Sequence, residues 1–263
     1  MRYQKGSIGL NDRRDKAILH FVADSRYVTH SQLWELSKAD YAEVDRRVFN
    51  WRIRRLVQSG LVRKQVPPFL NGEALYSISG RGIQALERLG IYYLGANLDR
   101  ETDASELQIP HALELNAIRL ALMRTGLLSN WMPESFIRVL SLSPATAYAK
   151  VYDGIATVCL NTEFIEFAVE YERTLKSQVK YAKIRDAIES ENRLSLFLYL
   201  APSYELLRSL RNEFWDTKRL IFFGLVDEFK ENAFLAPVTP AKYDRMPFQH
   251  ALMRASALAK NRT

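Results

Sequence analysis

The sequence predicts an α/β (α+β) protein of two domains, on three observations. The chain has 263 residues, 48% hydrophobic and 25% charged, a balance typical of globular proteins with a sizeable core. Apolar residues at helical spacing dominate the first third, whereas strand-like runs alternate with helices in the remainder. The charge also changes along the chain: residues 1–90 contain 16 Lys and Arg against 9 Asp and Glu, and residues 91–263 contain 21 of each.

Several function classes are excluded by features that the sequence lacks. No apolar run approaches the length of a membrane-spanning helix, and the first residues contain no stretch long enough for a secretory signal. Cys159 is the only cysteine, so neither an internal disulfide nor a cysteine zinc finger can form. The histidines lack H-E-x-x-H spacing, and no phosphate-binding G-x-x-x-x-G-K-[ST] run is present. We therefore expect a cytoplasmic protein with no membrane partner.

Two helices are expected first. Asn11 or Asp12 can cap a helix that runs to about Ala23, and Thr29 can cap a second, shorter one. The residues expected to be buried in them are Ile18, Leu19, Val22, Leu33, Trp34 and Leu36.

A third helix is expected from about Ala42 to Ser59, ended by Gly60, which can take a positive φ without strain. Four apolar residues at helical spacing are expected to face the core: Val44, Val48, Trp51 and Leu56. Arg47, Asn50 and Arg54 then share another face, with Arg46 beside them.

A hairpin and a fourth helix complete the first ninety residues. The β-prone runs Leu61–Val66 and Ala74–Ile78 flank a tip rich in Pro, Asn and Gly, and Ser79 can cap the helix that follows. This order of helix, helix, helix, hairpin and helix resembles winged helix-turn-helix domains, which implies that the third helix enters the major groove of DNA.

The resemblance implies specific DNA contacts. Arg suits guanine and Asn suits adenine, so Arg47, Asn50 and Arg54 are the candidates for base contact, with Arg46 beside them. Arg52, Arg55, Arg63 and Lys64 are the candidates for phosphate contact. Two alternatives stay open: a solvated basic helix, and a winged helix that binds protein. Double-stranded DNA as partner implies nucleoid association.

The remainder is expected to form a second domain. The domain bounds are 1–93, a polar linker over 94–110, and 111–263. A helix from Pro110 to Gly126 should open the second domain. The strands expected after it are Trp131–Leu140, Ala147–Leu160, Glu163–Glu172, Leu194–Leu200 and Arg219–Phe223. Helices are expected over Arg173–Ser190 and Ser203–Asp216, which gives a mixed sheet flanked by helices.

This order resembles the restriction-endonuclease-like fold of PD-(D/E)XK nucleases, in which acidic residues on adjacent strands bind Mg²⁺. Asp153 matches the first acidic position, Glu170 the second, and Glu114 could add a third carboxylate. Glu172 stands where the family has Lys, and Tyr152 where it has Pro. Lys180 is the lysine that we assign to the catalytic set, although Lys150 and Lys176 could take its place.

The two halves together resemble the replication-relaxation family of plasmid and mobile-element proteins. The motifs that carry the likeness lie within residues 12–200: His111 with Leu115 and Asn116, Trp131 with Glu134, Tyr152–Gly154, Glu170–Thr174 and Lys180–Tyr181.

The likeness implies a sequence-specific DNA-binding protein that acts in replication, relaxation, transfer or transcription regulation of mobile DNA. Other replication or transfer proteins and a second copy of the chain are further partners that it allows. The second domain would then be a degenerate nuclease used for scaffolding or dimerisation, and DNA binding would need no cofactor. The alternative is a Mg²⁺-dependent endonuclease or nickase that the first domain targets to its site.

Overall fold

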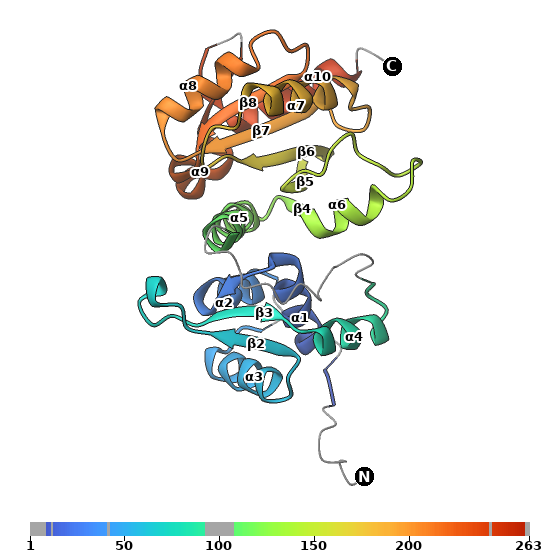
Figure 1. Ribbon diagram of the computed structural model, residues 1–263, viewed down its shortest axis with the longest axis vertical. Helices are drawn as coiled ribbons and strands as arrows, with labels where there is room; N and C mark the ends of the chain where they lie inside the picture. The colour runs from blue at the N-terminus through green and yellow to red at the C-terminus, as the bar shows by residue number, and fades with distance from the viewer. Residues whose placement is uncertain (1–8, 12, 41–42, 93–107, 242–243, 261–263) are drawn as a thin grey trace. The chain divides into compact units, whose positions relative to one another are not determined.

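The computed structural model describes residues 9–11, 13–40, 43–92, 108–241 and 244–260 (Figure 1). The chain divides into two compact units, Met1–Leu120 and Ala121–Thr263. The division falls inside helix α5 (Gln108–Arg124), after the expected linker over 94–110. Residues 94–107 of that linker lie outside the described residues, and 108–110 are helical.

The first unit has the expected winged helix-turn-helix arrangement. Its three-stranded sheet has the order β1-β3-β2, with both pairs antiparallel. The short strand β1, which pairs with β3, was not expected from the sequence. The elements are α1 (Arg14–Ser25), β1 (Val28–Thr29), α2 (His30–Ala39), α3 (Arg46–Gln58), β2 (Val62–Gln65), η1 (Pro68–Leu70), β3 (Leu75–Ile78), α4 (Gly80–Arg88) and the first part of α5.

Caps and buried stripes of the first two helices agree with the sequence. The Asn11 side chain accepts from Arg14 N at 2.8 Å, and Thr29 forms a capping box with Gln32. The predicted residues Ile18, Leu19, Val22, Leu33 and Leu36 are fully buried, and Trp34 is half-buried.

The core face predicted for α3 is correct at Leu56 but wrong at Val44 and Trp51. Phe49, Ile53 and Leu56 are its buried residues, whereas Val44 is 67% exposed and Trp51 54% exposed. Phe49, Ile53 and Leu56 are spaced four and three residues apart, which is one continuous stripe on a helix. Because Val44 lies before the first residue of α3, the apolar spacing counted from Val44 pointed to the wrong face of the helix. Gly60 has φ +72°, as its position after the helix requires.

The second unit is built on a seven-stranded mixed sheet of order β10-β9-β8-β7-β6-β5-β4. The pairs β6·β7 and β7·β8 are parallel, and the remaining pairs are antiparallel. Its strands are β4 (Leu128–Pro133), β5 (Gly154–Leu160), β6 (Glu163–Tyr171), β7 (Leu196–Ala201), β8 (Leu220–Leu225), β9 (Pro237–Pro240) and β10 (Met246–Pro247). The helices are α6 (Glu134–Leu140), α7 (Gln178–Ser190), α8 (Tyr204–Glu213), α9 (Val226–Asn232), η2 (Ala233–Leu235) and α10 (Phe248–Lys260).

Helices cover both faces of this sheet. One face packs Phe197, Tyr199 and Phe223 against residues of α6, α7 and α8 in a single core cluster. On the other face Phe167 contacts Phe248 of α10, and Phe248 contacts Phe229 of α9, with ring centroids 5.2 and 5.7 Å apart. The α/β (α+β) class is therefore confirmed.

Three predicted elements of the second unit need correction. Residues 134–140 form helix α6 and not the end of a strand, because Pro133 ends β4 and Glu134 pairs with Arg138 one turn later. Asp153 lies just before β5 and not within a strand that begins at Ala147. Helix α7 begins at Gln178, five residues after Arg173. Within the described residues, no helix combines the length and apolarity needed to cross a membrane.

Candidate functional site

The exposed side of α3 carries the residues predicted to contact bases. Asp45 caps the helix, since its Oδ1 accepts from Arg47 N at 2.7 Å and from Val48 N at 3.1 Å. Arg47, Asn50, Trp51 and Arg54 then recur at helical spacing along one exposed stripe. Within the described part of the chain, no hydrogen bond or ion pair engages the side chains of Arg47 and Arg54.

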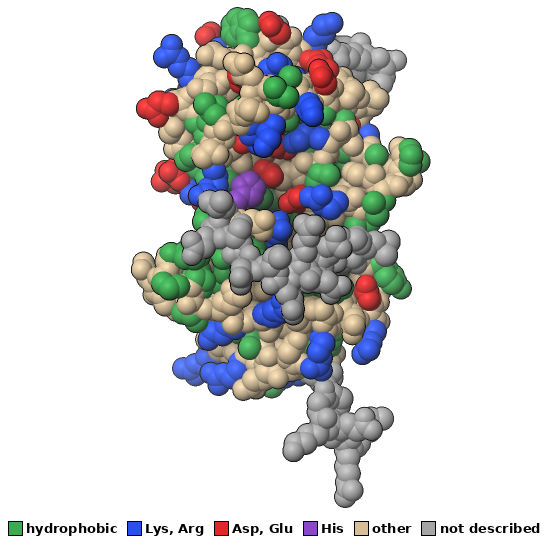
Figure 2. Space-filling view, viewed as in Figure 1, with side chains coloured by type: hydrophobic (Ala, Val, Ile, Leu, Met, Phe, Trp, Pro, Cys, Tyr) green, Lys and Arg blue, Asp and Glu red, His purple; other side chains and the backbone are tan. Residues whose placement is uncertain are grey.

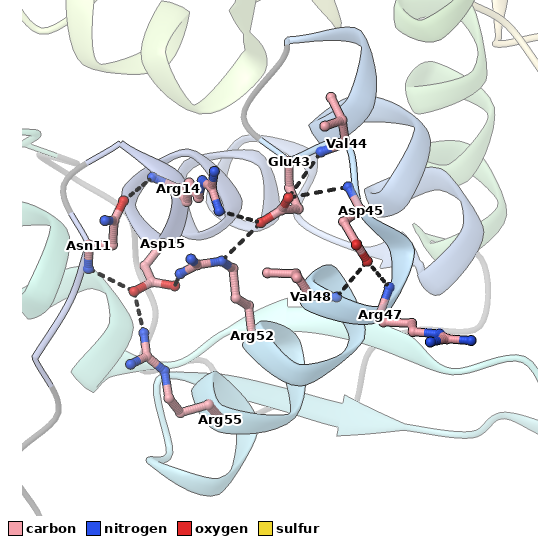
Figure 3. A network of polar contacts seen from close by, with 10 residues as sticks. All are labelled: Asn11, Arg14, Asp15, Glu43, Val44, Asp45, Arg47, Val48, Arg52 and Arg55. Atoms are coloured by element: carbon pink, nitrogen blue, oxygen red, sulfur yellow. Dashed lines mark hydrogen bonds and ion pairs between the residues drawn. The ribbon is translucent and has the colours of Figure 1, made fainter.

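Two other arginines of α3 are held inside the unit by buried acids (Figure 3). Asp15 of α1 accepts from Arg52 Nη1 at 3.0 Å and also pairs with Arg55. Glu43 accepts from Arg52 Nε at 3.1 Å and from Arg14 Nη1 at 3.3 Å. The Arg52 side chain is only 11% exposed. The phosphate contact predicted for Arg52 and Arg55 therefore lacks geometric support, and both side chains anchor α3 to α1.

Glu43 also organises the start of α3. Its Oε1 accepts from the backbone N of Val44 and of Asp45, at 3.1 and 3.2 Å. Figure 3 shows the Arg47 side chain pointing away from this network. The roles of Asp15 and Glu43 have no signature in the sequence, because each residue lies outside the helix that it anchors.

Aromatic residues contact Arg46 and, in addition to its buried acid, Arg55. The Arg46 guanidinium lies 5.0 Å from the ring centroid of Trp34, and that of Arg55 lies 4.9 Å from Trp51. Arg46 is therefore stacked at the side of the predicted contact stripe. Trp51, expected in the core, stands among the arginines of the exposed stripe.

The hairpin over residues 61–78, called the wing below, adds Arg63 and Lys64, which are exposed on β2. In Figure 2, Lys and Arg side chains gather on the part of the first unit where Figure 1 places α3. On the visible face of the second unit, charges of both signs are interspersed. The predicted DNA-binding residues other than Arg52 and Arg55 thus lie on α3 and β2 with exposed or stacked side chains.

The start of α5, expected to open the second domain, forms hydrogen bonds with residues of the first unit. Asn116 Nδ2 donates to Tyr27 O at 2.7 Å, and Gln32 Nε2 donates to Leu113 O at 2.7 Å. Glu114, the predicted third metal ligand, also lies in the first unit.

The second unit brings together the predicted acidic residues on adjacent strands. Asp153 lies one residue before the Gly154–Val169 pair, and its Oδ2 accepts from Tyr171 N at 2.8 Å. Glu170 pairs with Lys150 and Glu172 with Lys176. We call Asp153, Glu170, Glu172, Lys150 and Lys176 the carboxylate–lysine cluster.

Burial dominates the electrostatics of this cluster. It raises the pKa of Glu170 to about 7, with Asp153 adding to the shift and Lys150 opposing it. Tyr199, which lies beside Glu170 in the β6·β7 register, is fully buried. Its hydroxyl has no hydrogen-bond partner among the described residues, and its pKa is raised by burial and by Glu170.

The donors of the cluster do not fit the Mg²⁺ site that the resemblance implies. A hard cation needs carboxylate oxygens that converge on one point. Among the described residues, no group of three or more His, Cys, Asp or Glu side chains is arranged to hold a metal. Glu170 and Glu172 each face an ammonium group, and Asp153 accepts from a backbone N–H. Lys180 is exposed on α7, and it is Lys150 and Lys176 that pair with the acids.

Comparisons with known proteins give little beyond this geometry. No protein-family model matches the chain, and no curated protein matches it. The restriction endonuclease FokI bound to DNA is a solved structure with a TM-score of 0.27 and 12% sequence identity. The match covers 83% of this chain and 43% of that chain, so this chain spans less than half the length of FokI. Likeness at this level does not assign a family, and the resemblance to the replication-relaxation family stays a prediction.

Proposed function

We propose that the chain is a sequence-specific double-stranded DNA-binding protein, acting in replication, relaxation, transfer or regulation of mobile DNA. The proposal rests on one observation: the polar residues of α3 fall into two groups, one anchored inside the unit and one exposed. Arg52 and Arg55 are bound to buried acids, while Arg47, Asn50 and Arg54 stay exposed on one stripe. A helix anchored on one side with donors displayed on the other suits the major groove, whose base edges accept hydrogen bonds from Arg and Asn.

Charge supports the same assignment. The excess of 16 basic over 9 acidic residues lies in residues 1–90, where α3 and the wing are found. A basic surface on α3 and the wing concentrates attraction for phosphates at the reading helix.

Arginine substitutions test the proposal by fluorescence anisotropy with duplexes enriched from a randomised library. Arg47→Ala and Arg54→Ala should each weaken binding of the enriched duplex by about tenfold or more. Arg88→Ala, which removes the same charge from an exposed position on α4, should change binding by about twofold at most. Equal losses in all three variants would contradict base reading by α3, and no salt-dependent binding at all would favour a protein partner.

For the second unit we propose a scaffold without cleavage activity, serving dimerisation or contact with other replication or transfer proteins. The pairing of both buried glutamates with lysines supports this, because it leaves no convergent set of oxygens for a metal. Supercoiled plasmid incubated with the full chain and Mg²⁺ should stay intact. Nicking that disappears in Asp153→Ala and Glu170→Ala would instead establish the endonuclease alternative.

A further inference from the structure

His30 connects the wing to α3. It is the first residue of α2, and its backbone N donates to Ala74 O at 2.9 Å, next to the Thr29–Leu75 pair of β1 and β3. Thr29 and Gln32 close a capping box around the same turn. The backbone of His30 is therefore fixed both to the helix start and to the strand that ends the wing.

The imidazole ring is fixed at both nitrogens. Nδ1 lies 3.0 Å from the Tyr76 hydroxyl on β3, and Nε2 lies 3.0 Å from Oδ1 of Asn50 on α3. The ring also packs against Phe49, with centroids 5.3 Å apart. Asn50, one of the predicted base-reading residues, is thus tied through His30 to a buried tyrosine.

The protons along this chain can be placed. Burial and then the charge of Arg46 lower the pKa of His30, so the ring is neutral at neutral pH and carries one N–H. Burial raises the pKa of Tyr76, so its hydroxyl keeps its proton. An amide oxygen only accepts, so Nε2 carries the hydrogen and donates to Asn50, while Nδ1 accepts from Tyr76.

We propose that His30 is a positioning residue that holds the Asn50 amide with its oxygen inward and its NH₂ group outward, so that Asn50 reads guanine. The inference rests on the proposed DNA-binding function. Guanine presents two acceptors, N7 and O6, to the major groove, which match the two hydrogens of the NH₂ group. Bidentate reading of adenine needs the amide oxygen to face the base edge as well, and here that oxygen is bound to His30.

The test compares base preferences selected by the full chain from a randomised duplex library. The wild type should prefer guanine at the base position that Asn50 contacts. Asn50→Ala should lose the preference at that position and keep the preferences at all other positions. His30→Phe keeps a ring against Phe49 but removes the donor to Asn50. It should reduce guanine discrimination at the same position by about tenfold.

Two further variants separate positioning from a general loss of structure. His30→Gln keeps a side-chain N–H and should retain more of the guanine preference than His30→Phe. Arg47→Ala should alter a different position, and the thermal unfolding midpoints of the variants show whether each is folded.

Three results would overturn the inference while leaving the proposed function standing. They are adenine preference at the Asn50 position in the wild type, an unchanged preference in His30→Phe, and equal weakening of every position in His30→Phe. A wild-type chain that enriches no sequence at all would refute the proposed function, and this inference with it.

Discussion

Asp15 is fully buried, and it receives hydrogen bonds from two arginines of a different helix. Charged groups enter a protein interior at a cost, which is met only when the partners and hydrogen bonds are complete. Arg52 donates to both Asp15 and Glu43, so the two buried acids share one cationic partner. At the residue scale, α3 is therefore held by an ionic network and not by apolar packing alone.

Replacement of Asp15 with Ala should lower the free energy of unfolding by about 3 kcal/mol, because it leaves Arg52 largely buried without one of its acids. Urea unfolding followed by far-UV circular dichroism measures the change. Arg54→Ala, at an exposed position on α3, should stay within about 0.5 kcal/mol of the wild type. A small effect of Asp15→Ala would mean that the network contributes little to stability.

Glu170 gives a pH dependence of defined sign. Its pKa is raised by burial from 4.5 to about 7 in the folded chain, so the folded state binds more protons than the unfolded state between these values. The contribution of Glu170 to stability is fully present below its unfolded-state pKa of 4.5. It is lost as the pH rises through its folded-state pKa of about 7.

Wild-type unfolding free energy should therefore fall between about pH 5 and about pH 7, by at most about 1.4 kcal/mol per pH unit from this group. Glu170→Gln should flatten that slope, whereas Glu134→Gln, at a more exposed ion pair, should not. Urea titrations over this range provide the comparison. An identical slope in Glu170→Gln would place the titrating group elsewhere.

The junction between the wing and α4 shows how one short element is locked to another. The Ser79 hydroxyl accepts from Gly82 N at 3.0 Å, and its proton faces Gly60 O at 2.6 Å and Leu61 O at 2.9 Å. One side chain therefore caps α4 and ties it to the chain just before β2. A Cβ at Gly82 would lie 2.2 Å from the same Leu61 oxygen and 2.6 Å from Ile78 Cδ1. At the scale of the element, glycine is required at position 82 because Leu61 and Ile78 lie too close to the backbone of α4 for a side chain to fit.

The two glycines of α4 make a matched pair. Gly82→Ala should destabilise the chain by at least about 1–3 kcal/mol, because backbone would have to move to relieve the clash. Gly80→Ala meets nothing within 4 Å and should be neutral or slightly stabilising, since Ala favours helix. Thermal unfolding of both variants tests this, and equal midpoints would show that α4 shifts freely.

Helix ends that are marked by capping residues could be predicted from the sequence. The buried face of α3 depends on tertiary contacts and could not be predicted in full. Thr29, Ser79 and Gly60 mark helix ends through backbone chemistry, and each was placed correctly. Trp51 was expected in the core because it lies at helical spacing from Val44, Val48 and Leu56, yet Phe49 and Ile53 pack inward and leave Trp51 exposed.

The candidate sites show the same limit. The resemblance to PD-(D/E)XK nucleases pointed to Asp153 and Glu170, which lie just before β5 and near the end of β6. Lys150 pairs with Glu170 and Lys176 with Glu172, and no sequence spacing singled out these two lysines. Asp15, Glu43 and His30 act on α3 from other elements, so only the folded chain reveals them.

At the scale of the whole molecule, the basic excess belongs to the part of the chain that carries α3 and the wing. Residues 91–263 contain equal numbers of basic and acidic residues, 21 of each. The second unit, Ala121–Thr263, contains 19 basic and 16 acidic residues, whereas residues 1–90 contain 16 against 9. The general attraction for a phosphate backbone is therefore concentrated in the part of the first unit that carries α3 and the wing. The dependence of DNA affinity on salt should therefore be set by the first unit.

Two exposed lysines, one in each unit, provide the test. Lys64→Ala on β2 should reduce the slope of log K against log salt by about 0.9, the value for one lost phosphate contact. Lys183→Ala on α7 removes the same charge from the second unit and should leave the slope unchanged. Anisotropy titrations at several salt concentrations with one duplex give both slopes. If Lys183→Ala lowers the slope as much as Lys64→Ala does, the second unit touches DNA directly, and the basic first unit would no longer account for binding on its own.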